Sequence, residues 1–494
     1  MSYLEQKEPP KREDRLHACI ACGGSLSGVV KRMRCCLPDG ERGFTQNSIC
    51  LLLPAMGIMA SLPNSVVLMH GASGCGSSAH ASNAAVRAGN TQRWGVVKDG
   101  IWASTALTEQ EVIGGGEDKL AAAIRELDRR FKPDIIFVVA GCVPGIIGDD
   151  VNGVATQLQP EVAAKLLPVH CEGFKTKIWA TAYDAIYHAV GQVMLKNADQ
   201  KPATQKQDKP LINLFNVGSM GRIDEIELER LLQTLGFDTN IFPVFAKTEN
   251  IYRLTQASLS ISTCPTHDDY LLQYLEEKFH IPYVFRHMPI GVRNTGEWLR
   301  SVGEHFGIQE QVEALIAKEE AELNAALTEL KPAFAGKKVF VSAGEFRSLA
   351  TAILLAELGF DVVAVRAYHH DEFADGEYDK LAAITAKDFA FNIANCQPFE
   401  EANLLLREKP DVFLGHMNCN TTAAKLGTVV SPIYNAGLQF MGYQGAYQLA
   451  RRLHRQLTNS RFNQKLSRWT RLPYQESWYE QNPFAYIKNA EGDE

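Results

Sequence analysis

The sequence lacks several features that define common classes of protein. No apolar run approaches the roughly 20 residues that a membrane span requires, and the opening residues, MSYLEQKEPPKREDR, are polar and unlike an export signal. Basic residues are not in excess, because the formal net charge is −7, which gives no reason to expect nucleic acid as a partner. The phosphate-binding pattern G-x-x-x-x-G-K-[ST] is also absent. We therefore expect a cytoplasmic protein that neither enters a membrane nor binds ATP through that loop.

The composition is that of a soluble protein with several domains. Its 494 residues are 46% hydrophobic and 22% charged, which suits roughly three domains by the usual size of a domain. Two polar joints, NADQKPATQKQDKP (197–210) and KPAFAGKK (331–338), each precede a new apolar run. The predicted domains are therefore 1–205, 206–332 and 333–494.

Each predicted domain alternates two kinds of segment. Short apolar runs such as PDIIFVVAGC, ASLSISTC and PDVFLGH are typical of buried strands, whereas DKLAAAIRELDRRF and IQEQVEALIAKEEAELNAALTEL have helical periodicity. Such alternation predicts parallel sheets covered by helices on both faces. The predicted fold class is α/β, with three Rossmann-like domains.

The eleven cysteines require an explanation, because a cytosolic chain rarely carries a disulfide framework. Burial explains Cys171 and Cys396 best, since a free cysteine behaves as a small hydrophobe. Cys50 precedes a predicted helix, while Cys75 and Cys142 follow apolar strands and are flanked by glycine, at the sheet edge where α/β proteins bind ligands. Glycines there let the backbone approach a bulky inorganic cluster. The spacing of the three cysteines alone matches no generic metal motif.

Another thiol lies where a helix is expected to begin. The stretch SISTCPTHDDYLLQYLEEKFHIPYV (260–284) predicts a short strand, then Cys264 and Pro265, then an amphipathic helix. Cys264 is thus predicted at the carboxyl end of a strand, on the ligand-binding edge of its sheet.

A further cysteine group occupies the amino-terminal arm, in HACIACGG and RMRCCLPDG. A zinc knuckle is one interpretation of Cys19, Cys22, Cys35 and Cys36, but the second pair lacks the usual spacing. Disulfide-prone or buried thiols are the alternative.

The sequence motifs around the other cysteines resemble those of a known protein family. HGASGCG, LTEQEVIGGGEDKL, GCVPGIIGDDV and VHCEGFK, followed by EEKFHIPYV, AGEFRSLATAILLAELGFDVV and KPDVFLGHMNCNTTAAKLG, resemble in this order the component 1 family of nitrogenase. The resemblance covers nearly the whole chain, and CEGF together with Cys264 fits the α-type subunit better than the β-type.

The resemblance implies two iron–sulfur sites. Cys50, Cys75 and Cys142 match the cysteines that hold half of the P-cluster, an [8Fe-7S] cluster shared with a β-type subunit, and Cys264 matches the ligand of a large iron–sulfur–carbide cofactor. Thiolates suit such soft clusters. The implied partners are the β-type subunit, in an α2β2 heterotetramer, and an ATP-dependent iron protein that donates electrons.

Departures from nitrogenase bear on the reaction. Trp179 and Tyr183 stand where the family has a glutamine and a histidine, and Asn418 replaces a lysine near homocitrate. The histidine that binds molybdenum or vanadium falls at Tyr434, with His416 as a nearby candidate. The resemblance therefore implies a cofactor without a heterometal and argues against dinitrogen reduction.

Three further residues are assigned to the cofactor pocket, each with an alternative. Arg347 aligns with an arginine that would neutralise an anionic cluster, or it is a solvent-exposed arginine at a helix start. Ile58 aligns with a residue that gates substrate access, or it is a core isoleucine. His267 lies one helical turn from Cys264 and would donate a hydrogen bond or a proton, or would cap the helix. Cys419 lies nearby but matches no ligand of the family.

The pair Trp179 and Tyr183 helps to choose among three functions. As an aromatic wall it favours a nitrogenase-like reductase that cleaves the carbon–sulfur bond of methylthio-alkanes to a thiol and a hydrocarbon, although both rings could merely fill the room of homocitrate. The alternatives are a scaffold for assembly of the nitrogenase cofactor and a true nitrogenase α subunit. In the reductase, His267, Trp179, Tyr183 and Arg347 are the predicted catalytic residues, and the substrate is a small organic sulfur compound.

Overall fold

The computed structural model describes residues 6–33, 40–44, 50–77, 79–196, 198, 209–395, 397–415, 417–435 and 437–488. Cys35, Cys36, Cys396 and His416 lie outside the described residues, as do the side chains of Asn418 and Cys419. Among the described residues, no helix is both long and apolar enough to traverse a bilayer.

Three sheets organise the chain, and their strands are parallel apart from one at an edge. The first has the order β4-β3-β5-β6 and the second β10-β9-β7-β8, while the third has the order β1-β13-β12-β11-β14-β15 with β1 antiparallel. The bounds are β1 (Ala21–Ser25), β3 (Ser65–His70), β4 (Ile101–Ser104), β5 (Ile135–Ala140), β6 (Lys165–His170), β7 (Leu211–Phe215), β8 (Asp238–Phe242), β9 (Leu259–Ile261), β10 (Tyr283–Val284), β11 (Lys338–Ala343), β12 (Asp361–Ala367), β13 (Ala390–Ala394), β14 (Val412–Gly415) and β15 (Val429–Pro432). The predicted α/β class with three Rossmann-like units is confirmed.

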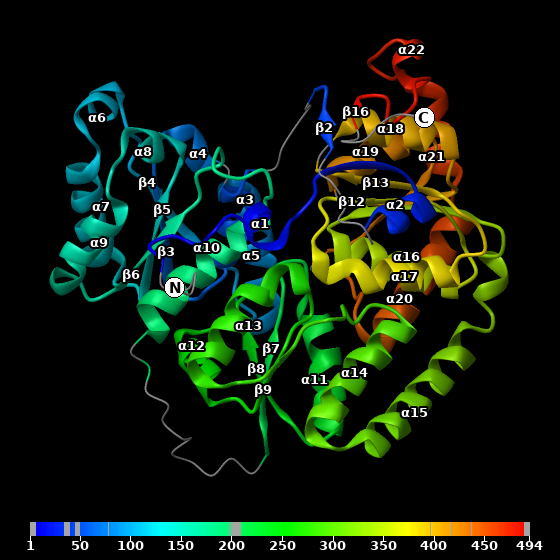
Figure 1. Ribbon diagram of the computed structural model, residues 1–494, viewed down its shortest axis with the longest axis horizontal. Coiled ribbons are helices and arrows are strands. Elements are labelled where there is room, and N and C mark those ends of the chain that lie inside the picture. Colours follow the sequence, from blue (N-terminus) through cyan, green and yellow to red (C-terminus); the bar gives the residue numbers. More distant parts are fainter. Residues whose placement is uncertain are drawn as a thin grey trace.

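Helices lie between successive strands and cover the sheets (Figure 1). Those that matter for the site are α3 (Leu52–Met59), α4 (Ser73–Ser77), α8 (Cys142–Ile147), α10 (Thr181–Ala189), α13 (Pro265–Phe279) and α16 (Glu345–Glu357). The remaining helices of eight or more residues are α2 (Leu26–Met33), α5 (Ala79–Trp94), α7 (Glu117–Phe131), α9 (Val151–Leu158), α11 (Arg222–Thr234), α14 (Val292–Phe306), α15 (Gln309–Leu327), α17 (Asp375–Ile384), α18 (Pro398–Glu408), α19 (Met417–Lys425), α20 (Gly442–Thr458) and α21 (Arg461–Trp469). The two segments predicted from helical periodicity form α7 and α15.

The apolar interior joins the units instead of separating them. One core combines Val67 and Phe137 of the first sheet with Phe242 of the second. Another combines Ile212 of the second sheet with Val341 of the third. The second unit therefore packs against both of the others, and the ligand-binding edges of the sheets are held in fixed relation.

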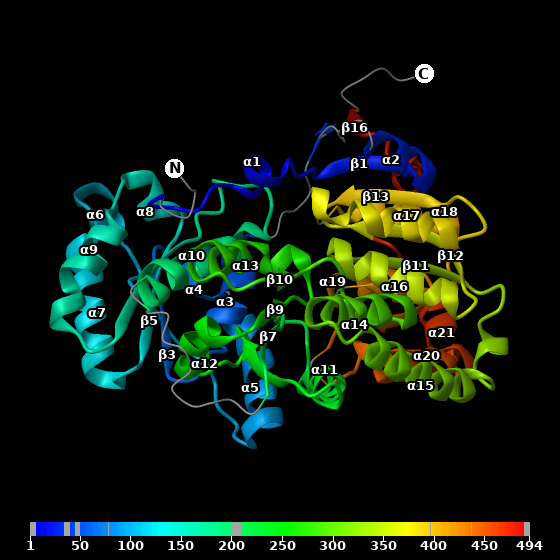
Figure 2. The same cartoon turned by 60° about the horizontal axis from the view of Figure 1, so that its bottom comes forward.

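The amino-terminal arm crosses the molecule. After α1 (Arg12–Leu16) the chain reaches the third sheet, where β1 pairs with β13, and α2 then packs against α17. Figures 1 and 2 show this blue segment running from the first unit to the yellow third unit. Each predicted domain range thus contains one of the three larger sheets, except that residues 21–25 of the first range belong to the third sheet. A fourth sheet of two strands pairs β2 (Glu41–Arg42) of the first range with β16 (Ile487–Lys488) of the third.

Candidate functional site

A cavity of about 250 Å³ lies where the three units meet. Its wall is built from α3 and the start of α10 in the first unit, from the start of α13 in the second, and from α16 and the loops after β12 and β15 in the third. Seven of the residues that the sequence analysis placed around the cofactor line this one cavity, namely Ile58, Trp179, Tyr183, Cys264, His267, Arg347 and Tyr434.

Cys264 is placed at the cavity by the local sequence. It is the N-cap of α13 in extended conformation, because Pro265 at the first helical position suits a helix start. Its backbone N–H donates to Ser262 Oγ over 2.9 Å, and the side chain is buried. Burial and the neighbouring Asp268 raise the pKa of the Cys264 thiol to about 12, against the opposing effect of Arg347. Such a thiol ionises at neutral pH only when a metal cation binds it.

Several polar atoms around the cavity have no hydrogen-bond partner in the protein. They are Trp179 Nε1, Thr266 Oγ1, His267 Nδ1 and Arg347 Nη1, all shielded from solvent. Leaving one such group unsatisfied costs about 1–3 kcal/mol. Because Trp179 and Arg347 can only donate, the set suits a ligand rich in acceptors and negative charge.

Arg347 is a buried residue of α16, so the alternative of a solvent-exposed arginine is excluded. Its Nη2 donates to Ser219 Oγ over 2.7 Å. Burial lowers its pKa, while the Cys264 and Asp224 side chains act in the opposite direction. The guanidinium therefore supplies positive charge within the cavity without a carboxylate bonded to it there.

Aromatic rings form one side of the cavity, here called the aromatic wall: Trp179, Tyr183, His267 and Tyr368. The Trp179 ring makes edge contacts with the other three at centroid distances of 5.8–6.4 Å, and Tyr183 stacks on His267 at 3.8 Å. The His369 ring lies against Trp179 at 6.3 Å without lining the cavity. Burial and the nearby Arg347 lower the pKa of His267 well below its usual value, so its imidazole is neutral. Ile58 both lines the cavity and belongs to the core.

The sequence analysis missed Tyr368 and His369. Both directly follow β12, at the carboxyl end of a parallel strand, which was the available signal. The family resemblance assigned no role to the motif AYHHD (367–371), so neither residue was predicted.

A buried charge cluster, here called the arginine clasp, ties the cavity elements together. Arg12 of α1 lies 3.0 Å from Asp184, 3.0 Å from Asp269 and 3.3 Å from Asp371. These aspartates belong to α10, to α13 and to the loop after β12, and Arg15 also pairs with the first two. These ion pairs thus join the arm to one element from each of the three units next to the cavity.

The other three predicted ligands gather near the surface, away from the cavity. Cys50 precedes α3, Cys75 lies in α4 and Cys142 begins α8; the first two are exposed and the third is half-buried. A Cβ added to Gly173 would lie 3.2 Å from Cys50 Sγ and 3.7 Å from Cys142 Sγ. Burial and the neighbouring Cys142 and Cys50 thiols raise the pKa of Cys75. The three thiols therefore form one group with an open side.

The remaining described cysteines are buried. Cys171 is enclosed as predicted, and Cys19 and Cys22 are equally enclosed. Each of the seven described cysteines is free of a disulfide. Burial is thus the structural environment of Cys19 and Cys22, while their predicted companions lie outside the described residues.

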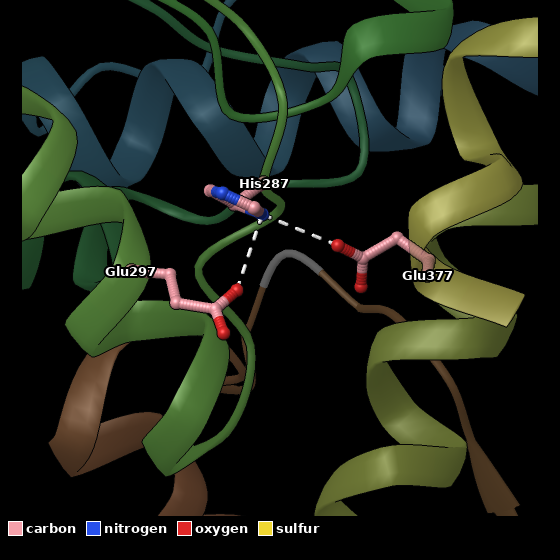
Figure 3. A group of neighbouring side chains, drawn as sticks. All are labelled: His287, Glu297 and Glu377. Carbon is pink, nitrogen blue, oxygen red and sulfur yellow. Dashed lines mark hydrogen bonds and ion pairs between the residues drawn. The ribbon is translucent and has the colours of Figure 1, made fainter. Parts of the chain in front are cut away.

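A group with potential metal ligands, His287, Glu297 and Glu377, lies between α14 and α17 (Figure 3). His287 Nδ1 is 3.4 Å from Glu297 and 3.2 Å from Glu377. Lys380 Nζ donates to Glu377 over 2.6 Å, also donates to Glu297, and lies 3.2 Å from His287 Nδ1. The ammonium group already occupies the position that a cation would take.

The family model for nitrogenase component 1 type oxidoreductases matches residues 50–458 of this chain. The chain belongs to this family. The match includes the three-cysteine group, Cys264 and every other residue predicted around the cavity.

Relatives of two kinds are similar to this component 1 chain. The nitrogenase molybdenum-iron protein alpha chain of Methanococcus maripaludis is 28% identical over 70% of this chain and 72% of its own length. The nitrogenase iron-molybdenum cofactor biosynthesis protein NifE of Methanosarcina barkeri is 25% identical over 91% of this chain and 94% of its own. Among solved structures, nitrogenase Cp1 at pH 6.5 superposes with a TM-score of 0.70 at 19% identity, covering 96% of this chain and 99% of that one. The structural likeness shows that the fold is shared.

The donor set fits an iron–sulfur cofactor in the cavity of this component 1 chain. A single buried thiol offers a soft ligand, and the unpartnered donors of Trp179 and Arg347 suit cluster sulfides. Tyr434, predicted at the position of the family's second ligand, lines the same cavity. A phenol there is a harder ligand than an imidazole, which bears on the metal at that end.

Proposed function

We propose that this chain is the cofactor-carrying α-type subunit of a nitrogenase-like reductase, in which Cys264 and the cavity hold a large iron–sulfur cofactor. The observation that carries the proposal is the convergence of one buried thiol with four unpartnered polar groups on a single cavity. When bound, the cofactor would supply the electrons for reduction. No molybdenum or vanadium is required, because tyrosine stands where the family has histidine.

The three-cysteine group would hold half of a P-cluster. Its thiols are accessible from one side, and Gly173 leaves space beside two of them, so a β-type subunit would complete the site from that side. We assign electron delivery to a separate ATP-dependent iron protein, because this chain lacks the phosphate-binding loop. The assembly would be an α2β2 heterotetramer.

The proposed substrate is a methylthio-alkane. Reductive cleavage breaks one carbon–sulfur bond, with two electrons and two protons taken up: carbon gains one hydrogen to give a hydrocarbon, and sulfur gains the other to give a thiol. The aromatic wall offers an apolar, polarizable surface to methyl and sulfur groups. That surface distinguishes the cavity from one built for a polar organic acid.

Two side chains have further roles in this proposal. The neutral His267 imidazole, stacked on Tyr183, can relay a proton toward substrate, accepting one at its unprotonated ring nitrogen while the other nitrogen gives up its own. Arg347, with its free Nη1, balances negative charge in the cavity.

A second candidate is a scaffold on which the nitrogenase cofactor is assembled. It has the more direct support from the comparisons, because NifE relatives align over 86–91% of this chain, whereas the alpha chains align over 67–72%. The reductase proposal depends instead on the side chains of the cavity.

One experiment separates the two candidates. The chain is co-purified with its β-type partner without oxygen, its iron, molybdenum and vanadium are measured, and the iron protein, ATP and a methylthio-alkane are then added. The reductase proposal predicts a released thiol and hydrocarbon, with high iron and no heterometal. A loaded complex that gives no product but transfers its cluster to cofactor-free nitrogenase would overturn it in favour of the scaffold.

A further inference from the structure

A compact group of potential metal ligands lies beside the aromatic wall and has no part in the proposed reaction. Glu345 is the first residue of α16, and His369 and Asp371 lie on the loop after β12. One ligand atom from each lies within 4.8 Å of the other two, and all three side chains are buried. Here they are called the Glu345 group.

His369 supplies the observation that points to a ligand. Its side chain is 1% exposed, yet Nδ1 has no hydrogen-bond partner, and Nε2 has none apart from a long approach to Asp371. Nε2 faces Asp371 Oδ2 at 3.5 Å. A buried imidazole normally satisfies at least one nitrogen, since leaving a polar group unpaired costs about 1–3 kcal/mol. A metal ion bound by this ring would remove that cost.

The two carboxylates are oriented by surrounding donors. Glu345 Oε1 accepts from His370 Nδ1 over 2.8 Å and from Tyr378 Oη over 2.7 Å, while Oε2 accepts from the Asp371 backbone N–H over 3.1 Å. Outer hydrogen bonds of this kind fix the ligands in protein metal sites. Asp371 Oδ1 accepts from the Phe373 backbone N–H over 3.3 Å, and Oδ2 lies 3.3 Å from Arg12 Nη2. Each carboxylate therefore holds a set direction before any ion binds.

The contrast with the group in Figure 3 is informative. There, Lys380, which Figure 3 does not draw, places its ammonium among His287, Glu297 and Glu377. In the Glu345 group the approaching cation is Arg12, which lies 3.3 Å from Asp371 but divides its contacts among three aspartates. His369 Nδ1 has no hydrogen-bond partner, and Nε2 has only the 3.5 Å approach to Asp371 Oδ2.

We propose that Glu345, His369 and Asp371 bind one divalent ion of the first transition row. An imidazole with two carboxylates suits Mn²⁺, Fe²⁺ or Zn²⁺, and the remaining coordination positions would take water. This nitrogen–oxygen site is distinct from the thiolate sites at Cys264 and at the three-cysteine group. It does not depend on the proposed reaction.

The position suggests what the ion does. Glu345 also lines the cavity, and His369 packs against Trp179 at 6.3 Å. A divalent ion there would add positive charge next to a cavity that suits an anionic cofactor. It would also join the loop after β12 to the start of α16 at Asp371, which the arginine clasp shares.

Mn²⁺ is the probe for the test, because its room-temperature EPR signal falls when the ion binds protein. The full chain, purified without oxygen and dialysed against a chelator, is titrated with Mn²⁺. The main variant is His369→Phe, which keeps a ring against Trp179 and removes both nitrogens. The matched control is His287→Phe, which alters the group that Lys380 already fills.

The proposal predicts that wild type and His287→Phe bind one Mn²⁺ per chain more than His369→Phe does. It also predicts a ¹⁴N coupling to Mn²⁺ in pulsed EPR that His369→Phe loses, and a rise in melting temperature with Mn²⁺ that is confined to wild type and the control. If His369→Phe fails to fold, Glu345→Gln is the second variant with the same expected loss. Equal Mn²⁺ binding by wild type and a folded ligand variant, or wild-type Mn²⁺ without a ¹⁴N coupling, would overturn the proposal.

Discussion

The two thiol regions of this component 1 chain differ in how completely the chain itself builds them. Cys264 is buried, has its backbone fixed by Ser262 and faces a cavity lined by residues of all three units. Cys50 and Cys75 are exposed on the first unit. A site finished within one chain can select its ligand by shape and charge, whereas an open group of thiols requires a second surface. The cavity would therefore determine which ligand and substrate bind, and the open thiol group would determine which partner subunit binds.

The largest effect is expected from Cys264→Ala. Loss of the single thiol removes the only strong cluster ligand assigned to the cavity, so the co-purified complex should lose its cofactor iron and all activity. Iron analysis and the turnover assay measure both. Cys171→Ala is the control, because Cys171 is equally buried but does not line the cavity. A Cys264→Ala complex with full iron and full turnover would contradict the assignment.

Cys142→Ala tests the open region. It should remove the P-cluster signal from EPR and Mössbauer spectra and slow turnover strongly, while the cofactor at Cys264 is retained. Weaker co-purification of the β-type subunit should accompany the loss, since the proposed cluster would join the two chains. If the variant instead loses the cofactor and keeps the P-cluster signal, the two regions have been assigned in reverse.

Arg12→Met tests how much the ion pairs of the arginine clasp stabilise the elements around the cavity. The substitution leaves buried Asp184, Asp269 and Asp371 without the shared guanidinium, and breaking a buried ion pair costs about 3–5 kcal/mol. Urea unfolding of the full chain should show a loss of that size. Arg87→Met, which breaks an exposed pair with Asp99, is the control and should leave the midpoint unchanged. Equal midpoints for the two variants would show that the clasp contributes little.

The smallest expected effect is on the pH dependence of stability. Burial lowers the pKa of His188, on α10, to about 4, whereas the unfolded value is near 6.5. Between these values the unfolded chain binds the extra proton, so stability should fall as pH drops from about 6.5 to about 4. His188→Gln should flatten that part of the profile, measured as melting temperature against pH. A profile with the same slope in both proteins would rule out His188 as its cause.

Local pattern predicted part of both thiol regions. Apolar runs followed by glycine or proline placed Cys142 and Cys264 correctly at the carboxyl ends of β5 and β9, because strand and helix signals are contained in short windows. The resemblance added Ile58, Trp179, Tyr183, Arg347 and Tyr434, and the structure brings them all to one cavity.

Contacts between distant segments could not be predicted in this way. The pairing of β1 with β13 joins residues more than 360 positions apart, and the clasp joins Arg12 to Asp371. Neither has a local signature, since a polar arginine near the amino terminus is ordinarily solvated. His369 was missed because its importance lies in unpartnered nitrogens, which only the packed structure reveals.

The most direct test of the central claim is an iron-edge anomalous difference map. Crystals of the complex would be grown without oxygen from protein that retains its metal. The account predicts strong iron density that fills the cavity and is bonded to Cys264 Sγ at about 2.3 Å, together with a second cluster at the three-cysteine group. Iron at the three cysteines alone, beside a cavity without iron, would contradict it.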